Sequence, residues 1–128
     1  MATRKCDGVI YKILQATEFL TIVTNGEHGP HLAGSWGDYL RVLLSEGDTI
    51  IIPAGRYWQT EKNLRKDARI SVMAASRQVQ SMRGGQGCIL IGHGEVVNVG
   101  PHAEKVKAKF PWARGALLIH VEEARTQR

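Results

Sequence analysis

Residues 50–66 read Ile-Ile-Ile-Pro-Ala-Gly-Arg-Tyr-Trp-Gln-Thr-Glu-Lys-Asn-Leu-Arg-Lys. The three isoleucines are typical of a buried strand. The Pro-Ala-Gly that follows ends the strand, because proline lacks a backbone N–H and glycine adopts unusual dihedrals. We expect residues 56–59 to form a loop and the Thr60 hydroxyl to cap a helix that begins at Glu61. This order suits an anionic, partly aromatic ligand at the helix N-terminus, although many proteins have a strand, loop and helix without one.

The length and composition indicate a single globular domain spanning residues 1–128. The chain is 43% hydrophobic, which is enough for one core. It has neither a signal-peptide pattern nor the roughly 20 consecutive apolar residues that a membrane span needs, so we expect a cytoplasmic protein without a membrane partner. The two cysteines, Cys6 and Cys88, form no Cys-x-x-Cys motif and are expected to be free thiols.

The charge of the chain leaves two classes of partner open. A net charge of +5 would admit nucleic acid, but the cations are dispersed, and they would equally attract a phosphate-bearing cofactor. A basic barrel that binds single-stranded nucleic acid through exposed aromatics is therefore only a distant alternative. His28 and His31 flank an apparent turn without a third ligand at a recognisable spacing, so we expect no metal site.

The pattern along the rest of the chain predicts a mainly β protein. A helix over Gly8–Ala16, capped by Asp7, precedes a strand over Glu18–Thr24 and a hairpin turn at Asn25-Gly26. The segments expected after the hairpin are a strand over 30–40, a third strand or its continuation over 41–44, further strands over 69–76, 88–99 and 115–122, a glycine-rich loop over 80–87, and a helix over 101–110. Many short strands with few helices favour a small closed or partly closed antiparallel barrel.

No motif of this sequence predicts a catalytic residue. The glycine-rich loop lacks the lysine of a phosphate-binding P-loop and precedes a strand, so it fits neither that motif nor a dinucleotide fingerprint. It is either a flexible connection or a close approach of backbone to a flat ligand. No serine stands in a Gly-x-Ser-x-Gly elbow, and no pair of carboxylates is placed for acid–base chemistry.

The aromatic residues are few, and most fall at strand ends and in loops. The aromatic residues at such positions are Trp36, Tyr39, Tyr57, Trp58 and Trp112. Two interpretations remain open at this point: the rings cover the end of a barrel, or some of them flank a planar ring system.

Four separated segments carry a resemblance to a known family. They are Gly29-Pro30-His31-Leu32 with Trp36 and Tyr39 behind it, Ile51-Ile52-Pro53-Ala54-Gly55 leading to Thr60-Glu61-Lys62-Asn63, Ser76-Arg77, and Phe110-Pro111-Trp112-Ala113-Arg114. With these segments in this order, the chain resembles the FMN-binding split barrels, the superfamily of the pyridoxamine-phosphate oxidases, and among them the small FMN-binding proteins. The resemblance implies a six-stranded antiparallel Greek-key split barrel with two or three short helices. It also implies a homodimer that holds one noncovalent FMN per subunit at its interface.

The resemblance assigns roles to individual residues. Gly34, Ser35 and Trp36 would lie along the flavin and its phosphate, and the backbone of residues 53–55 would lie near the isoalloxazine ring. Trp112 would approach the flavin bound to the other subunit. The full set of expected cofactor contacts is Gly34, Ser35, Trp36, Pro53, Ala54, Gly55, Gln59, Thr60, Arg77, Gly84, Gly85, Gln86, Gly87 and Trp112.

Two departures from the family pattern concern the phosphate. Gln59 stands where the small FMN-binding proteins have a lysine, and Gly34-Ser35 replaces an asparagine-threonine pair. Arg56, Arg77 or Arg83 would supply the missing positive charge, since arginine suits phosphate. The expected function is that of an electron-transfer or small redox flavoprotein, served by a partner protein or a small-molecule electron donor. A flavin-dependent oxidoreductase of the same superfamily is the alternative.

Overall fold

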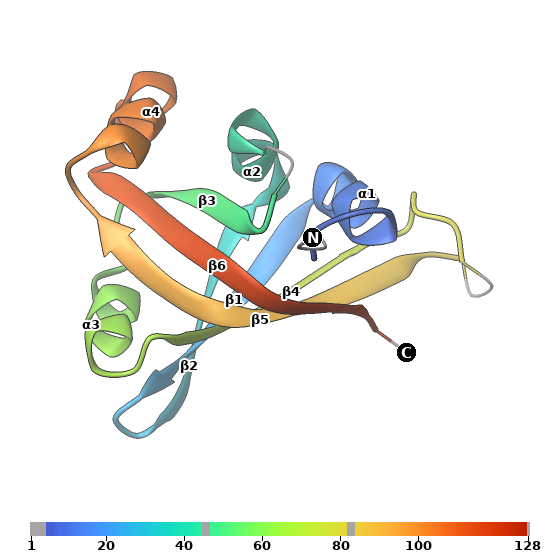
Figure 1. Ribbon diagram of the computed structural model, residues 1–128, viewed down its shortest axis with the longest axis horizontal. Coiled ribbons are helices and arrows are strands. Elements are labelled where there is room, and N and C mark those ends of the chain that lie inside the picture. Colours follow the sequence, from blue (N-terminus) through green and yellow to red (C-terminus); the bar gives the residue numbers. More distant parts are fainter. Residues whose placement is uncertain (1–4, 45–46, 82–83, 128) are drawn as a thin grey trace, which may run out of the picture.

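One curled antiparallel sheet of six strands organises the molecule (Figure 1). The computed structural model describes residues 5–44, 47–81 and 84–127. In chain order the elements are α1 (Val9–Ala16), β1 (Phe19–Gly26), β2 (Gly29–Trp36), α2 (Gly37–Leu43), β3 (Thr49–Ala54), α3 (Trp58–Lys66), β4 (Arg69–Ser76), β5 (Gln86–Val97), α4 (Pro101–Lys109) and β6 (Gly115–Thr126). The strand order is β2-β1-β4-β5-β6-β3. The expected six-stranded split barrel is confirmed, with four helices in these ranges rather than two or three.

The concave side of the sheet encloses the main core. Along β1 burial alternates residue by residue, so that Leu20 and Ile22 point inward, as period-two patterning requires. Ile13 and Leu14 of α1 are fully buried against the same core. Burial of each such side chain stabilises the folded protein by about 1.5–3 kcal/mol, so these two residues hold α1 against the sheet.

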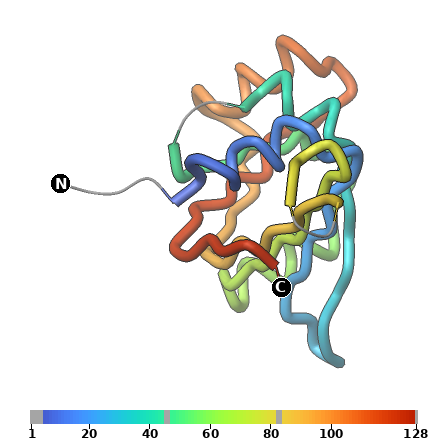
Figure 2. Tube along the Cα trace, turned by 90° about the vertical axis from the view of Figure 1, so that its right-hand side faces the viewer, coloured from blue at the N-terminus to red at the C-terminus, as the bar shows by residue number. Residues whose placement is uncertain are grey.

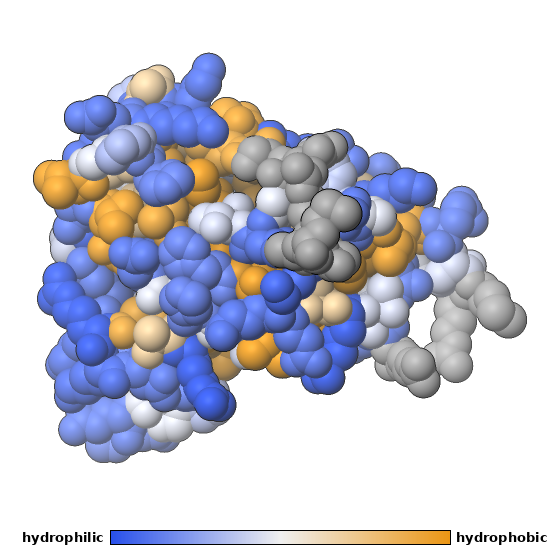
Figure 3. Space-filling view, in the orientation of Figure 1, coloured by the Kyte–Doolittle hydropathy of each residue, from blue (hydrophilic) through white to orange (hydrophobic). Residues whose placement is uncertain are grey.

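The strand β3 is buried on both faces, which explains its unbroken apolar run. Ile50 and Ile52 face the main core, whereas Ile51 joins a second cluster with Val106 of α4 and Leu43 of α2. The helices α2 and α4 lie on this outer side of the sheet (Figure 1). The view in Figure 3 is mostly hydrophilic, and apolar side chains gather around these two helices.

The strand expected over 30–40 is confirmed as far as Trp36, where β2 ends, but residues 37–43 form a helix, so the strand expected for 37–40 and its continuation over 41–44 were wrong. Leu40 and Leu43 are buried three residues apart, a helical spacing that a short apolar run does not reveal. Gly37 begins the helix and donates its N–H to the Glu18 carbonyl at 2.8 Å. A Cβ at Gly37 would stand 1.8 Å from the Thr17 oxygen, so only glycine permits this close approach.

The β1–β2 hairpin projects beyond the rest of the sheet (Figures 1 and 2). The hairpin is confirmed, but its turn falls at residues 27–28, because Asn25 pairs with Pro30 and Gly26 pairs with Gly29. The helix cap expected from Asp7 was also wrong: Gly8 is the N-cap and has no side-chain cap, and the Asp7 carboxylate accepts the N–H of Gly8 at 2.7 Å.

The strand β5 contains a bulge at Gly92. The register with β6 shifts between Ile91 and Gly92. A Cβ at Gly92 would lie 2.0 Å from the His120 carbonyl oxygen, so the backbones meet there too closely for a side chain. The helix that begins at Pro101 is confirmed at its expected first residue.

Candidate functional site

A crevice of about 660 Å³ opens between β2 and the end of β3, the two edge strands of the sheet. Its lining residues are Phe19, Gly34, Ser35, Trp36, Tyr39, Pro53, Gly55, Arg56, Tyr57 and Trp112. Because the sheet curls without closing, the gap between its edges is where a ligand can reach both strands. Six expected cofactor contacts, from three separate segments of the sequence, meet in this crevice.

Two glycines let aromatic rings pack directly against the backbone of the crevice walls. A Cβ at Gly34 would stand 2.0 Å from Cζ of Phe19, so the Phe19 ring lies directly over this backbone. A Cβ at Gly55 would lie 3.0 Å from the six-membered ring of Trp112. Aromatic rings therefore approach backbone at both walls, an arrangement that glycine alone allows without displacing a ring.

The aromatic side chains form two groups along the walls. Tyr39 and Trp112 have ring centroids 5.3 Å apart, and Phe110 packs against both rings. Phe19 and Trp36 meet edge to face at 5.4 Å. The side chains of Trp36 and Trp112 remain 52% and 53% exposed. Half-exposed rings at a crevice present apolar area to a planar ligand.

Tyr57 joins the two edges of the crevice. Its hydroxyl donates a hydrogen bond of 2.6 Å to the Gly34 carbonyl across the gap. Its backbone is left-handed, with φ of 55°, and serves as the N-cap of α3. Burial raises the pKa of the Tyr57 hydroxyl, and the neighbouring Ser35 hydroxyl lowers it by less.

The expected cap at Thr60 was wrong, because α3 begins at Trp58. Thr60 lies inside the helix, with 1% of its surface exposed. The turn that starts the helix depends on the strained Tyr57 backbone and on its contact with a distant strand, and neither feature belongs to the local capping pattern. Trp58 and Gln59, expected in a loop, are therefore the first residues of a helix.

Arg114 holds the lip of the crevice in place. Its guanidinium donates to the Arg56 carbonyl at 2.7 and 3.2 Å and pairs with the Glu61 carboxylate at 2.9 Å. The flat guanidinium also stacks over the Trp58 ring, with its central carbon Cζ 3.7 Å from the ring centroid. No role was expected for Arg114 from the sequence, although this residue ends the segment 110–114 that carries the family resemblance.

The remaining expected contacts do not line the crevice. Ala54 is fully buried between two lining residues. Gln59 donates to the Asn63 side chain at 2.8 Å and faces a hollow of about 230 Å³ beside the β1–β2 hairpin. The residues that line a separate hollow of about 350 Å³ include Arg77, Gly84, Gly85, Gln86 and Gly87. Arg83 lies outside the described residues.

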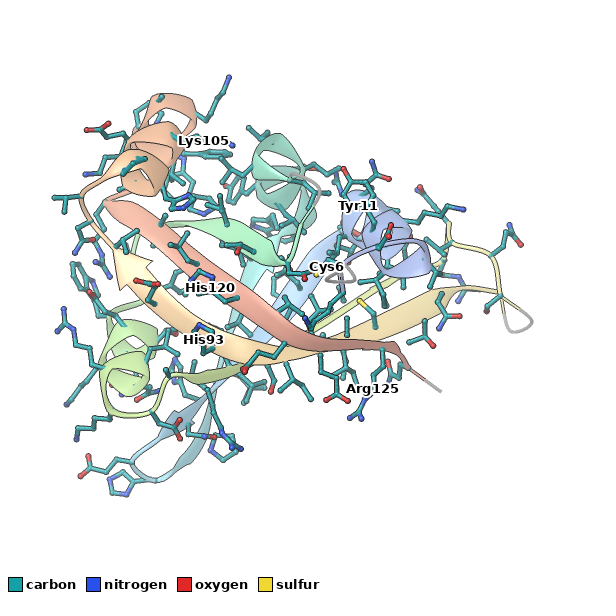
Figure 4. The ribbon with its side chains drawn as sticks, in the orientation of Figure 1. Cys6, Tyr11, His93, Lys105, His120 and Arg125 are labelled. Carbon is teal, nitrogen blue, oxygen red and sulfur yellow. The ribbon has the colours of Figure 1, made fainter. Side chains whose placement is uncertain are left out.

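A pair of histidines on β5 and β6 forms a separate cluster (Figure 4). His93 and His120 stack with ring centroids 4.8 Å apart. Nε2 of His120 lies 3.0 Å from the Glu95 carboxylate, and its Nδ1 lies 3.2 Å from the Thr49 hydroxyl. Within residues 5–44, 47–81 and 84–127, no three His, Cys, Asp or Glu side chains are placed to hold a metal ion.

Comparison with known proteins places this geometry in a family. The chain is 37% identical over 118 residues to the FMN-binding protein of Nitratidesulfovibrio vulgaris, and the match covers 91% of this chain and 94% of that protein. The chain belongs to the FMN-binding split-barrel family. No family model matches it.

Solved structures show how widely the fold of this FMN-binding split-barrel protein recurs. HupZ of Group A Streptococcus superposes with a TM-score of 0.77 at 17% identity, covering 94% of this chain and 98% of that chain. A Clostridium acetobutylicum protein of the pyridoxinephosphate oxidase family gives 0.67 at 16% identity, covering 92% and 84%. At such identities the likeness establishes the fold alone.

None of the helices in the described ranges is long and apolar enough to cross a membrane.

Proposed function

We propose that this chain binds FMN in the crevice between β2 and β3 and acts as an electron-transfer flavoprotein. The observation that carries the proposal is the meeting of three distant segments in one crevice, with the rings of Trp36 and Trp112 half-exposed at its walls. The crevice volume of about 660 Å³ falls in the range typical of small-molecule sites. The 37% identical relative that is named an FMN-binding protein supports the same cofactor.

The residues of the crevice are suited to binding and orienting a flavin. FMN itself supplies the redox chemistry when bound. The half-exposed rings of Trp36 and Trp112 present apolar area against which a planar ring can lie. Trp112 lies over Gly55 of its own chain, so it contributes to the crevice of its own subunit.

The titratable side chains of the crevice favour an electron carrier over an enzyme. Within the described part of the chain, its lining contains Tyr39, Arg56 and Tyr57 as titratable residues and no carboxylate or histidine. The Tyr57 hydroxyl already donates to Gly34, and burial raises its pKa. A general acid or base near neutral pH is therefore missing from these lining residues.

We further propose that two copies associate through the convex face of the sheet. Cross-strand registry places Leu32, Val23, Ser71 and Ile91 in one row on this face, with Thr21, Met73 and Ile89 in the next. Leu32 is 66% exposed and Met73 is 45% exposed. An apolar face of this kind is typical of a protein interface. Phe19 and Trp36 continue it to the crevice.

Titration of the purified protein with FMN tests the main proposal. We expect binding of one FMN per chain, seen as quenching of flavin fluorescence and a shifted absorption spectrum. Trp112→Ala should weaken binding, whereas Val99→Ala changes an exposed apolar residue outside the crevice lining and should not. A wild-type protein that takes up no FMN would refute the proposal.

The alternative is an oxidoreductase that acts on a small substrate at the flavin. The open form of the crevice favours it, because Trp36 and Trp112 leave the site accessible to solvent. Steady consumption of a reduced nicotinamide by the FMN-loaded protein would support this alternative. Reduction of the flavin without turnover would support the carrier.

A further inference from the structure

The crevice contains one positive side chain in the part of the chain that the structure describes, Arg56 at its rim. Gln59, at the position where the resemblance implies a lysine, is uncharged, and its amide donates to Asn63 inside α3. We propose that Arg56 holds the phosphate of the bound flavin nucleotide and makes the site selective for phosphorylated flavin. This inference rests on the proposed function.

The backbone of Arg56 is fixed while its side chain is free. Its carbonyl accepts two hydrogen bonds from the Arg114 guanidinium, at 2.7 and 3.2 Å. The Arg56 side chain is exposed and forms no ion pair or hydrogen bond within residues 5–44, 47–81 and 84–127. A guanidinium with all its donors available can contact a phosphate with two parallel hydrogen bonds.

The neighbouring arginines are already engaged. Arg114 bonds to the Arg56 carbonyl, to Asn98 at 3.1 Å and to Glu61 at 2.9 Å, so few of its donors remain for a ligand. Arg41 pairs with Asp38 and donates to the Thr17 carbonyl at 2.7 Å. Neither of them lines the crevice.

Arg77 is the competing candidate. It is exposed and lines the separate hollow beside Gly84–Gly87, so it does not reach the crevice of its own chain. It could contact a ligand only from a second copy. Arg56, in contrast, adjoins Gly55, whose backbone lies against Trp112 in the same crevice.

The test compares FMN with riboflavin, which has the same ring and ribityl chain but no phosphate. Dissociation constants for both flavins are measured by fluorescence quenching with wild-type protein, Arg56→Gln, Arg77→Gln and Lys62→Gln. Lys62 is an exposed cation of α3 outside the crevice, so Lys62→Gln controls for the loss of one positive charge. Because Arg56 is exposed, Arg56→Gln should fold normally, and thermal unfolding checks this.

We expect Arg56→Gln to weaken FMN binding about 10- to 100-fold, the range for losing hydrogen bonds to a charged group. Riboflavin affinity should stay the same, and the salt dependence of FMN binding should flatten. Lys62→Gln should leave the FMN-to-riboflavin ratio at its wild-type value. The inference would be overturned if Arg56→Gln left the FMN-to-riboflavin affinity ratio unchanged, or if Arg77→Gln lowered that ratio instead. Failure of wild-type protein to bind either flavin would instead overturn the proposed function.

Discussion

The guanidinium of Arg114 and the carboxylate of Glu61 form an ion pair of 2.9 Å that is shielded from solvent on both sides. Their side chains are only 20% and 9% exposed. The pair connects the start of β6 to α3, and the same guanidinium holds the Arg56 carbonyl. The lip of the crevice is therefore fixed by a charge pair formed between residues 53 positions apart in the sequence.

Replacing Arg114 with alanine should destabilise the protein by roughly 3 kcal/mol. This is the lower end of the cost of breaking a buried pair, because Glu61 keeps a second contact with Arg65 at 2.9 Å. Urea unfolding of Arg114→Ala measures the loss. Arg65→Ala is the matched control, since Arg65 contacts the same carboxylate with a side chain that is 74% exposed. That control should cost less than about 0.5 kcal/mol, and an equal loss in both variants would contradict the assignment.

Gly34 and Phe19 should show strong coupling in a double-mutant cycle. A Cβ at position 34 would stand 2.0 Å from the Phe19 ring, so Gly34→Ala must displace that ring and should cost about 1–3 kcal/mol. Phe19→Ala removes the obstacle, so the double variant should recover most of the loss. Unfolding free energies of the four proteins give the coupling. Additive effects would show that the ring and the glycine backbone do not meet.

The sequence was informative where burial is periodic. The isoleucine run of β3 and the alternation in β1 indicated strands, and both strands occupy the expected positions. The matched segments predicted which distant residues meet at the crevice, including Gly34 and Trp112. The strands could be inferred from side-chain type at short spacing, whereas the residues of the crevice were implied by the resemblance to the FMN-binding split barrels.

The features that the sequence did not reveal depend on tertiary contacts. The helix α2 was mistaken for a strand, because a short apolar run fits either structure until its neighbours are known. The start of α3 was placed three residues late, because it depends on the left-handed backbone of Tyr57 and on its hydrogen bond to Gly34. Arg114 was missed because its partners lie on α3 and on the lip of the crevice.

A charge on the convex face of the sheet should separate the proposed dimer. Leu32→Glu places a carboxylate in the apolar row with Val23 and Ile91. A residue central to an interface contributes about 2 kcal/mol or more to binding, so the dissociation constant of the dimer should rise at least roughly thirtyfold. Light scattering coupled to size exclusion measures the mass. Val99→Glu is the control, because Val99 is exposed in the loop before α4 and off this face. A wild-type protein that is monomeric would rule out the dimer.

Stability should fall as the pH rises above about 9, because two thiols are buried in the core. Burial raises the pKa of Cys6 to about 12 and that of Cys88 to about 11, from an ordinary value of 9.0. Below pH 9 the thiols are protonated in both the folded and the unfolded state. Between pH 9 and about 11–12 only the unfolded chain releases these protons, so the free energy of the unfolded state falls relative to that of the folded state.

The urea midpoint at about pH 10.5 should therefore lie below the midpoint at about pH 8. Cys88→Ala should reduce this difference, because it removes one of the two groups with a raised pKa. Part of the difference should persist, since the pKa of Tyr57 is raised in the same direction. A thiol reagent supplies an independent check: neither cysteine should react in the native protein at about pH 8, and both should react in urea. Equal midpoints at the two pH values, or rapid native labelling, would show that the thiols are not held in the core.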